Sequence, residues 1–189
     1  MLVMCIGLAG FLMMHSIRVV APQWREARIA SMGAANWRGL HLLGSLLFFV
    51  FLNYGYGLAR QSPELVWMPP SAMRHIGSLL LLVAFIFLAA SFVPNNHIKA
   101  KLQHPMLLGT KLWAFAHLLM VGWLHTIVLC SAFLLWAIIT FRSARRRGRV
   151  EVQPKAAMTV LTVLAGIGAF ALFAFVLHVR LIGVAPFGV

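Results

Sequence analysis

The sequence predicts an all-α fold, a polytopic membrane helix bundle with about six transmembrane helices. The chain has 189 residues, of which 62% are hydrophobic and only 10% charged, and its mean hydropathy is +0.92. A soluble domain is about one quarter charged. An apolar run of about 20 residues spans the hydrocarbon of a bilayer. The runs that meet this condition are Leu2–Val20, Leu40–Leu58, Ser71–Val93, Met106–Val121, Trp123–Phe141 and Ala157–Leu177.

The breaks between these runs carry the usual turn residues. Pro22 follows the first run, and the polar segment Trp24–Arg28 after it is expected to form a short interfacial helix. Pro94 and Pro105 bracket a polar loop before the fourth run. Gly122 alone separates the fourth run from the fifth, which predicts a tight antiparallel hairpin. The loops are too short for a soluble domain, so residues 1–189 are interpreted as a single membrane domain.

The charge distribution indicates topology rather than nucleic-acid binding. The net charge is +13, and a basic footprint is the first sign of a nucleic-acid-binding protein. Here, however, 13 of the 16 basic residues fall on alternate loops. The positive-inside rule then places both termini outside the cytoplasm. These residues are Arg18, Arg25, Arg28, Arg38, Lys99, Lys101, Lys111, Arg142, Arg145, Arg146, Arg147, Arg149 and Lys155.

Three further predictions concern the first apolar run, an arginine-rich stretch and the cysteines. The first apolar run begins at Met1 without a basic segment before it, so it is interpreted as a helix rather than a signal peptide. The stretch Arg142–Arg149 is interpreted as a cytoplasmic anchor, with anionic-lipid binding as the alternative. Cys5 and Cys130 fall inside predicted helices, which predicts buried thiols and no disulfide.

Histidine is the residue type with the clearest functional signal. The chain has eight histidines, and an ionisable side chain inside a membrane is a functional candidate by default. At helical spacing, His117 shares a face with Met106, Thr110, Trp113, Met120 and Leu124, and His15 shares one with Met4, Leu8, Phe11 and Leu12. Apolar and aromatic walls around an imidazole suit haem. The alternative is ordinary packing, with each imidazole hydrogen-bonded to the backbone or to a hydroxyl.

Depth does not identify a partner for His117. Counting about 1.5 Å per residue, His117 lies roughly 18 Å into its helix, His15 about 8–10 Å from the cytoplasmic end and His41 about 5 Å from it. The spacing therefore leaves His15 and His41 both open. His104 is expected to cap or orient the fourth helix, while His97 falls in the cytoplasmic loop. The outer group of His75, His125 and His178 could form a second haem or metal site, although histidines at an interface are common.

Several classes of chemistry are excluded by composition. The only acids are Glu26, Glu64 and Glu151, all in loops, and the chain contains no Asp. This excludes catalysis by paired carboxylates and metal sites rich in carboxylates. No zinc-ligand spacing and no phosphate-binding glycine loop is present.

The motifs together resemble the NnrU family, which includes the 15-cis-zeta-carotene isomerases. The most specific is the run from His104 to His117, which reads His-Pro-Met-Leu-Leu-Gly and, further on, Lys-Leu-Trp-Ala-Phe-Ala-His. The resemblance covers essentially the whole chain. Its other marks are His15 before a basic loop, Trp37–Leu40, Tyr54–Gly57, Arg74–His75 and Leu177–Gly183.

The resemblance implies a haem b protein in which His15 and His117 are the iron ligands and the catalytic residues. It thus favours His15 over His41. Phe11 and Trp113 are expected to wall the haem, with Arg18, Arg38 and Lys111 near its propionates. The isomerase branch further implies cis–trans isomerisation of an apolar polyene substrate within the membrane lipid. Plant isomerases carry a Cys where this chain has Ala114, which argues against a mechanism that uses a local thiolate.

Two other functions stay open at this stage. The first is a haem protein of nitrite or nitric oxide metabolism, which would transfer electrons to a redox partner or handle the gas. The second is a membrane assembly factor without a cofactor. The absence of a plastid transit peptide favours the bacterial inner membrane in either case.

Overall fold

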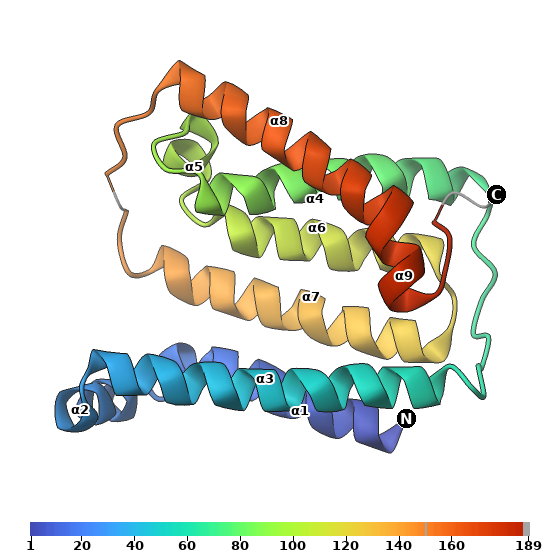
Figure 1. Cartoon of the computed structure of the whole chain (residues 1–189), viewed down its shortest axis with the longest axis horizontal. Helices are drawn as coiled ribbons and strands as arrows, with labels where there is room; N and C mark the ends of the chain where they lie inside the picture. The colour runs from blue at the N-terminus through green and yellow to red at the C-terminus, as the bar shows by residue number, and fades with distance from the viewer. Residues whose placement is uncertain (150, 187–189) are drawn as a thin grey trace. The chain divides into compact units, whose positions relative to one another are not determined.

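The computed structural model describes residues 1–149 and 151–186, and within them the chain is helical. Figure 1 follows the chain from blue to red through α1 (Leu2–Val20), α2 (Pro22–Met32), α3 (Ala34–Ala59), α4 (Ala72–Phe92), α5 (His97–Leu102), α6 (Pro105–Met120), α7 (Leu124–Arg145), α8 (Ala156–Leu172), η1 (Phe173–Leu177) and α9 (His178–Ile182). No strand occurs in these residues, which confirms the all-α prediction. A lone bridge joins Leu65 to Trp123.

Five helical segments are long and apolar enough to cross a membrane, so the protein is a multi-pass membrane protein. They are Leu2–Val20, Ala34–Ala59, Ala72–Phe92, Leu124–Arg145 and Ala156–Ile182. The remaining predicted span corresponds to α6. With 16 residues, α6 is about 24 Å long, shorter than a hydrocarbon core of about 30 Å.

The helices differ from the apolar runs mainly at their ends. The third helix begins at Ala34 rather than Leu40, and α7 continues to Arg145 rather than ending at Phe141. Hydropathy marks only the part of a helix that lies in lipid, whereas the helical backbone continues into the polar segments. The interfacial helix expected at Trp24–Arg28 is present and longer, with Pro22 in its first turn.

The chain divides into two compact units. The first contains Met1–Met68 and Gly122–Ala132, and the second contains Pro69–Val121 and Phe133–Val189. The division falls within α7, whose two parts belong to different units. That residues 1–189 form a single membrane domain stays a prediction.

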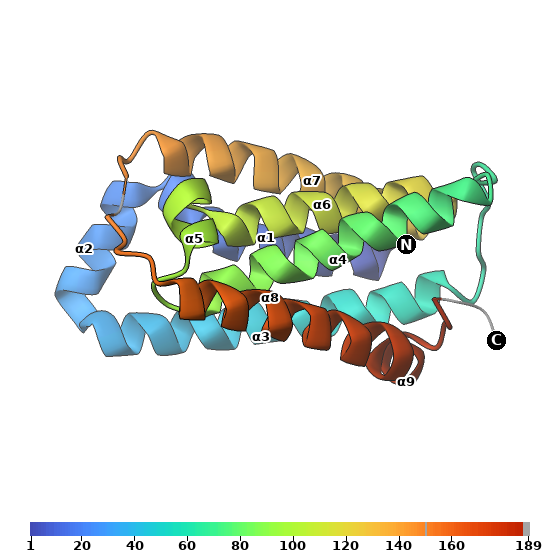
Figure 2. The ribbon, with the colours of Figure 1, turned by 90° about the horizontal axis from the view of Figure 1, so that it is seen from above.

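In the first unit, α1 and α3 pack closely and antiparallel through small residues (Figures 1 and 2). A Cβ on Gly7 would overlap the backbone of Leu52, and one on Gly55 would overlap the backbone of Met4. Met4 is fully buried at this crossing. Small residues let membrane helices approach until their backbones touch. Because helices in lipid gain no hydrophobic free energy by associating, this close van der Waals contact stabilises the pair.

The loop after α3 is tied to the turn that precedes α7. The amide of Val66 donates to the carbonyl of Gly122 at 2.9 Å, and the amide of Leu124 donates to the carbonyl of Glu64 at 2.9 Å. A side chain on Gly122 would overlap the carbonyl of Trp67. The glycine that the sequence marks as a break is therefore also the point of closest backbone approach.

In the second unit, α4 packs against α6 and α8, and both run antiparallel to it (Figure 2). Gly166 of α8 lies against Ile86 of α4, where a Cβ would come within 2.6 Å of the Ile86 Cα. Near the end of α4, Asn96 is fully buried. Its Nδ2 donates to the carbonyls of Ala90 and Val93, and its Oδ1 accepts from the amide of Lys99. This cap nucleates the short helix α5, which hydropathy does not detect.

The last membrane segment contains a π turn, η1, between α8 and α9. The amide of His178 donates to the carbonyl of Phe173, five residues earlier, and the rings of these two residues lie 5.9 Å apart. A π turn accommodates one extra residue in a helix. The turn therefore sets His178 over Phe173 rather than over Ala174, the residue that α-helical spacing would select.

The close crossing of α1 and α3 gives a first prediction. We expect Gly55→Ala to destabilise the protein by about 1–3 kcal/mol, because the added Cβ forces the two backbones apart. Gly57→Ala is the matched control, since a Cβ there meets nothing within 4 Å and alanine is the better helix former by about 1 kcal/mol. Thermal unfolding in detergent, followed by circular dichroism, measures both. Equal melting temperatures for the two variants would contradict the close crossing.

Candidate functional site

His15 lies on the buried stripe of α1 that the sequence predicts. Met4 is 0% and Leu8 5% exposed, and the ring of Phe11 lies 4.3 Å from that of His15. The Nδ1 atom of His15 is 2.8 Å from the carbonyl oxygen of Phe11. Because a carbonyl only accepts, Nδ1 carries the hydrogen and Nε2 carries the lone pair. This is the tautomer in which Nε2 can bind a metal.

His41 lies beside His15 but is bonded differently. The two ring centroids are 5.3 Å apart, edge to face. Nε2 of His41 donates to the carbonyl of Met14 at 3.1 Å, so the lone pair is on Nδ1, which lies 3.5 Å from the hydroxyl of Ser45. Both ring nitrogens of His41 are therefore engaged within the protein. The two rings therefore carry their lone pairs on different nitrogens, Nε2 in His15 and Nδ1 in His41.

His117 repeats the arrangement of His15 in the second unit. Its Nδ1 donates to the carbonyl of Trp113 at 2.8 Å, which again leaves the lone pair on Nε2. The Trp113 ring lies 5.0 Å from His117 and 5.5 Å from Phe133. The spacing predicted that Leu124 shares this face of the helix, and this prediction is wrong. The helix α6 ends at Met120, and Leu124 begins α7.

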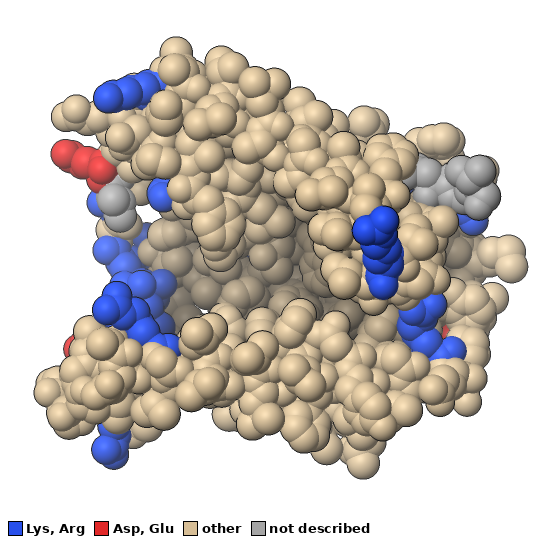
Figure 3. Space-filling view, viewed as in Figure 1, with Lys and Arg blue, Asp and Glu red and all other residues tan. Residues whose placement is uncertain are grey.

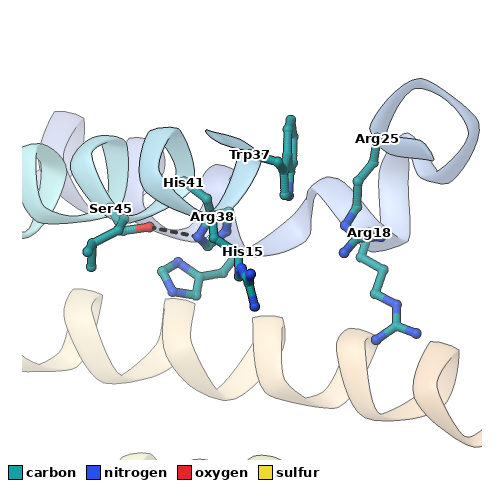
Figure 4. A pocket seen from close by; sticks show the side chains of 8 residues that line it. His15, Arg18, Arg25, Trp37, Arg38, His41 and Ser45 are labelled. Carbon is teal, nitrogen blue, oxygen red and sulfur yellow. Dashed lines mark hydrogen bonds between the residues drawn. The ribbon is translucent and has the colours of Figure 1, made fainter. Parts of the chain in front are cut away.

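A hollow of about 480 Å³ opens in the first unit next to His15. Figure 4 shows Arg18 and Arg25 on one side of Trp37, and His15, His41 and Ser45 on the other. The lining residues come from α1, α2 and α3, and are His15, Arg18, Arg25, Trp37, Arg38, His41, Leu42 and Ser45. Arg18 and Arg38 were expected near the candidate site from the sequence, whereas Arg25 and Trp37 were not.

Lys111, the third basic residue of the predicted site, lies in the second unit with His117. Its Nζ is 3.8 Å from the centroid of the Phe141 ring, a cation–π contact. The structure thus gathers Arg18 and Arg38 with His15, and it places Lys111 and Trp113 on α6 with His117.

The other histidines each have surroundings of their own. Among the described residues, no group of three His, Cys, Asp or Glu side chains is placed to hold a metal. His75 is exposed, the buried His125 packs edge to face on Tyr56 at 5.1 Å, and Nδ1 of His178 donates to the carbonyl of Val184. His104 is the N-cap residue of α6, but its side chain makes no capping bond.

The cysteines are both free, as predicted, although only Cys130 is fully buried and Cys5 is half-buried. Ala114, which stands where plant isomerases carry a Cys, is fully buried. No thiol is therefore supplied at that position of α6.

Basic side chains gather at helix ends, and the helix flanks are almost free of charge. In the view of Figure 3, Lys and Arg form blue groups at the ends of the helices, while the surface along the helices is tan. Leucines of α3 that follow the hollow are widely exposed, as in Leu42 at 65% and Leu46 at 54%. Such a surface is stable in lipid, where apolar exposure costs nothing.

Comparison with known proteins gives one match that covers nearly the whole chain. Residues 3–186 match the family described as NnrU protein. The chain has no significant match among curated proteins or among solved structures. The matched residues include those that line the hollow, His15 and His117, and nearly all of the membrane helices. The chain therefore belongs to the NnrU protein family.

Proposed function

We propose that this NnrU-family membrane protein binds haem b, with Nε2 of His15 and of His117 as the iron ligands. The observation that carries the proposal is the bond that each Nδ1 donates to the carbonyl four residues earlier. Histidines that bind metals usually donate their second ring N–H in this way, which fixes the ring and leaves the other nitrogen as ligand.

The surroundings of both histidines fit a porphyrin. Phe11 lies between His15 and Phe49, whose ring is 6.0 Å from that of Phe11. Trp113 occupies the equivalent place between His117 and Phe133. Flat apolar side chains beside an imidazole provide the walls that haem requires, and haem supplies a redox-active iron when bound. The remaining work of the chain is to hold the imidazoles and to exclude water.

The residues around the candidate ligands favour a reaction without general acid or base catalysis. None of the three acids lies in a candidate membrane span, and Ala114 supplies no thiol. An apolar substrate that needs neither proton transfer nor a nucleophile from the protein suits such a site. We propose cis–trans isomerisation of a polyene, the reaction implied by the resemblance to the zeta-carotene isomerases, in a bacterial inner membrane.

The haem proposal predicts that His15→Ala and His117→Ala each lower haem retention at least about tenfold. His75→Ala, an exposed histidine outside the candidate site, should retain haem. His41→Ala should also retain it, because both nitrogens of His41 are engaged within the protein. Absorption spectra of the purified oxidised and reduced proteins, with haem quantified as the pyridine complex, measure this. Loss of haem in His41→Ala but not in His15→Ala would reverse the assignment.

The isomerase proposal predicts a change in carotenoid isomers. In a carotenoid-producing bacterial host grown in the dark, the wild-type protein should convert a 15-cis polyene to its trans isomer. His15→Ala and His117→Ala should give the isomer ratio of the empty host, and His75→Ala that of wild type. Chromatography of extracted carotenoids measures the ratio. An unchanged ratio in cells whose protein carries haem would reject the isomerase while leaving haem binding intact.

The charge pattern predicts that both termini lie outside the cytoplasm, with α6 completing an even number of crossings. Alkaline phosphatase, which is active only outside the cytoplasm, should therefore be active when fused to the C-terminus and inactive when inserted between Arg142 and Lys155. The opposite pattern of activities would invert the topology.

A further inference from the structure

We infer that the hollow between α1, α2 and α3 binds the phosphate group of an anionic phospholipid through Arg18, Arg25 and Arg38. This site is separate from haem binding and does not depend on it. Three guanidinium groups from three different helices line one hollow of about 480 Å³, a size within the range of ligand pockets, about 300–1,000 Å³.

The three arginines have no ion-pair partner among the residues that the structure describes. None of their guanidinium groups forms an ion pair or a side-chain hydrogen bond with a described residue. The only acid in the first 59 residues is Glu26, and it does not line the hollow. Three like charges that converge on one space repel one another, so an anion in that space would stabilise the arrangement. Guanidinium groups recognise phosphate through paired, charge-assisted hydrogen bonds.

The position of the hollow indicates a lipid rather than a soluble phosphate. It lies where the apolar helix α1 ends and where α2, which has no buried residue, connects it to α3. Trp24 and Trp37 stack edge to face there, 5.7 Å apart, and tryptophans concentrate at the level of lipid headgroups. The hollow is thus at the depth at which a phospholipid carries its phosphate.

The surface beside the hollow offers a place for the acyl chains. Leu42 lines the hollow and is 65% exposed, and Leu46, one turn further along α3, is 54% exposed. Residues four apart share a helix face, so an apolar strip leads from the arginines along α3. A soluble phosphate would make no use of this strip, whereas a lipid would occupy both parts.

A haem propionate is the rival occupant, since His15 lines the same hollow. Arg18 and Arg25, however, lie across Trp37 from His15 (Figure 4). The His15 ring is bonded back to Phe11, one turn further from α2. The lipid site therefore centres on Arg18 and Arg25 at the α2 side, while Arg38 lies with the imidazole on the other side of Trp37 (Figure 4).

The test compares lipid retention in two variants that lose the same charge. The first is Arg18→Gln/Arg25→Gln/Arg38→Gln. The control is Arg74→Gln/Lys101→Gln/Arg180→Gln, whose basic side chains are exposed and lie outside the hollow. Each purified protein is titrated in detergent with dioleoyl-phosphatidylglycerol or dioleoyl-phosphatidylcholine, and bound lipid is counted by native mass spectrometry. His117→Ala in the wild-type background, which removes a proposed haem ligand outside the hollow, tests whether haem matters.

We expect the wild type and the control to bind phosphatidylglycerol in preference to phosphatidylcholine. The hollow variant should bind it about a hundredfold more weakly, since each arginine contributes about fivefold. His117→Ala should bind lipid as the wild type does, even if it has lost haem. Arg25→Gln alone should give about a fivefold loss, which keeps the test valid if the triple variant misfolds.

Three results would overturn the proposal. Equal weakening in the hollow variant and the control would show a general effect of charge. Loss of haem from the hollow variant with lipid binding unchanged would assign the arginines to the propionates. Displacement of the lipid by inorganic phosphate at millimolar concentration would indicate a site for a free anion.

Discussion

Hydrocarbon offers no hydrogen-bond partner, so the chain itself must satisfy every polar group within its membrane helices. The backbone does so by forming helices, and the polar side chains do so by bonding to the carbonyl four residues earlier. Ser91 bonds to Phe87 in this way, Thr110 to Met106 and Thr162 to Met158. His15 and His117 follow the same rule. In an imidazole, satisfying one nitrogen also determines what the other can do.

This constraint explains why the sequence could not distinguish a haem-binding histidine from one that is merely packed within the membrane. A histidine that merely satisfies its donor and a histidine prepared to bind a metal make the same bond to the backbone. His41 differs from both, because its ring bonds to a residue of another helix. It bonds to Met14 of α1 and approaches Ser45 of its own helix. Such a bond between residues 27 positions apart depends on how α1 and α3 pack, which residue spacing along one helix cannot show.

The sequence predicted the elements whose cause is local. The apolar runs located every membrane helix to within a few residues, except where polar segments such as Ala34–Gly39 continued the helix, and the buried face of α1 was correctly predicted at Met4 and Leu8. What it missed has a tertiary cause. The cap that forms α5 requires Asn96 to bond to two carbonyls at the end of α4. Arg25 joins Arg18 and Arg38 only because α2 folds against its neighbours.

The π turn at Phe173–Leu177 has a consequence for how this segment can vary. One extra residue in an α-helix rotates everything after it by about 100°, and a π turn absorbs that residue locally. The helix before the turn keeps Gly166 against Ile86, and α9 continues the helix after the turn. A one-residue deletion within the turn would restore an ordinary helix and leave His178 and Arg180 on nearly the same face. The segment can thus gain or lose one residue at this point without altering the packing of α8 on α4.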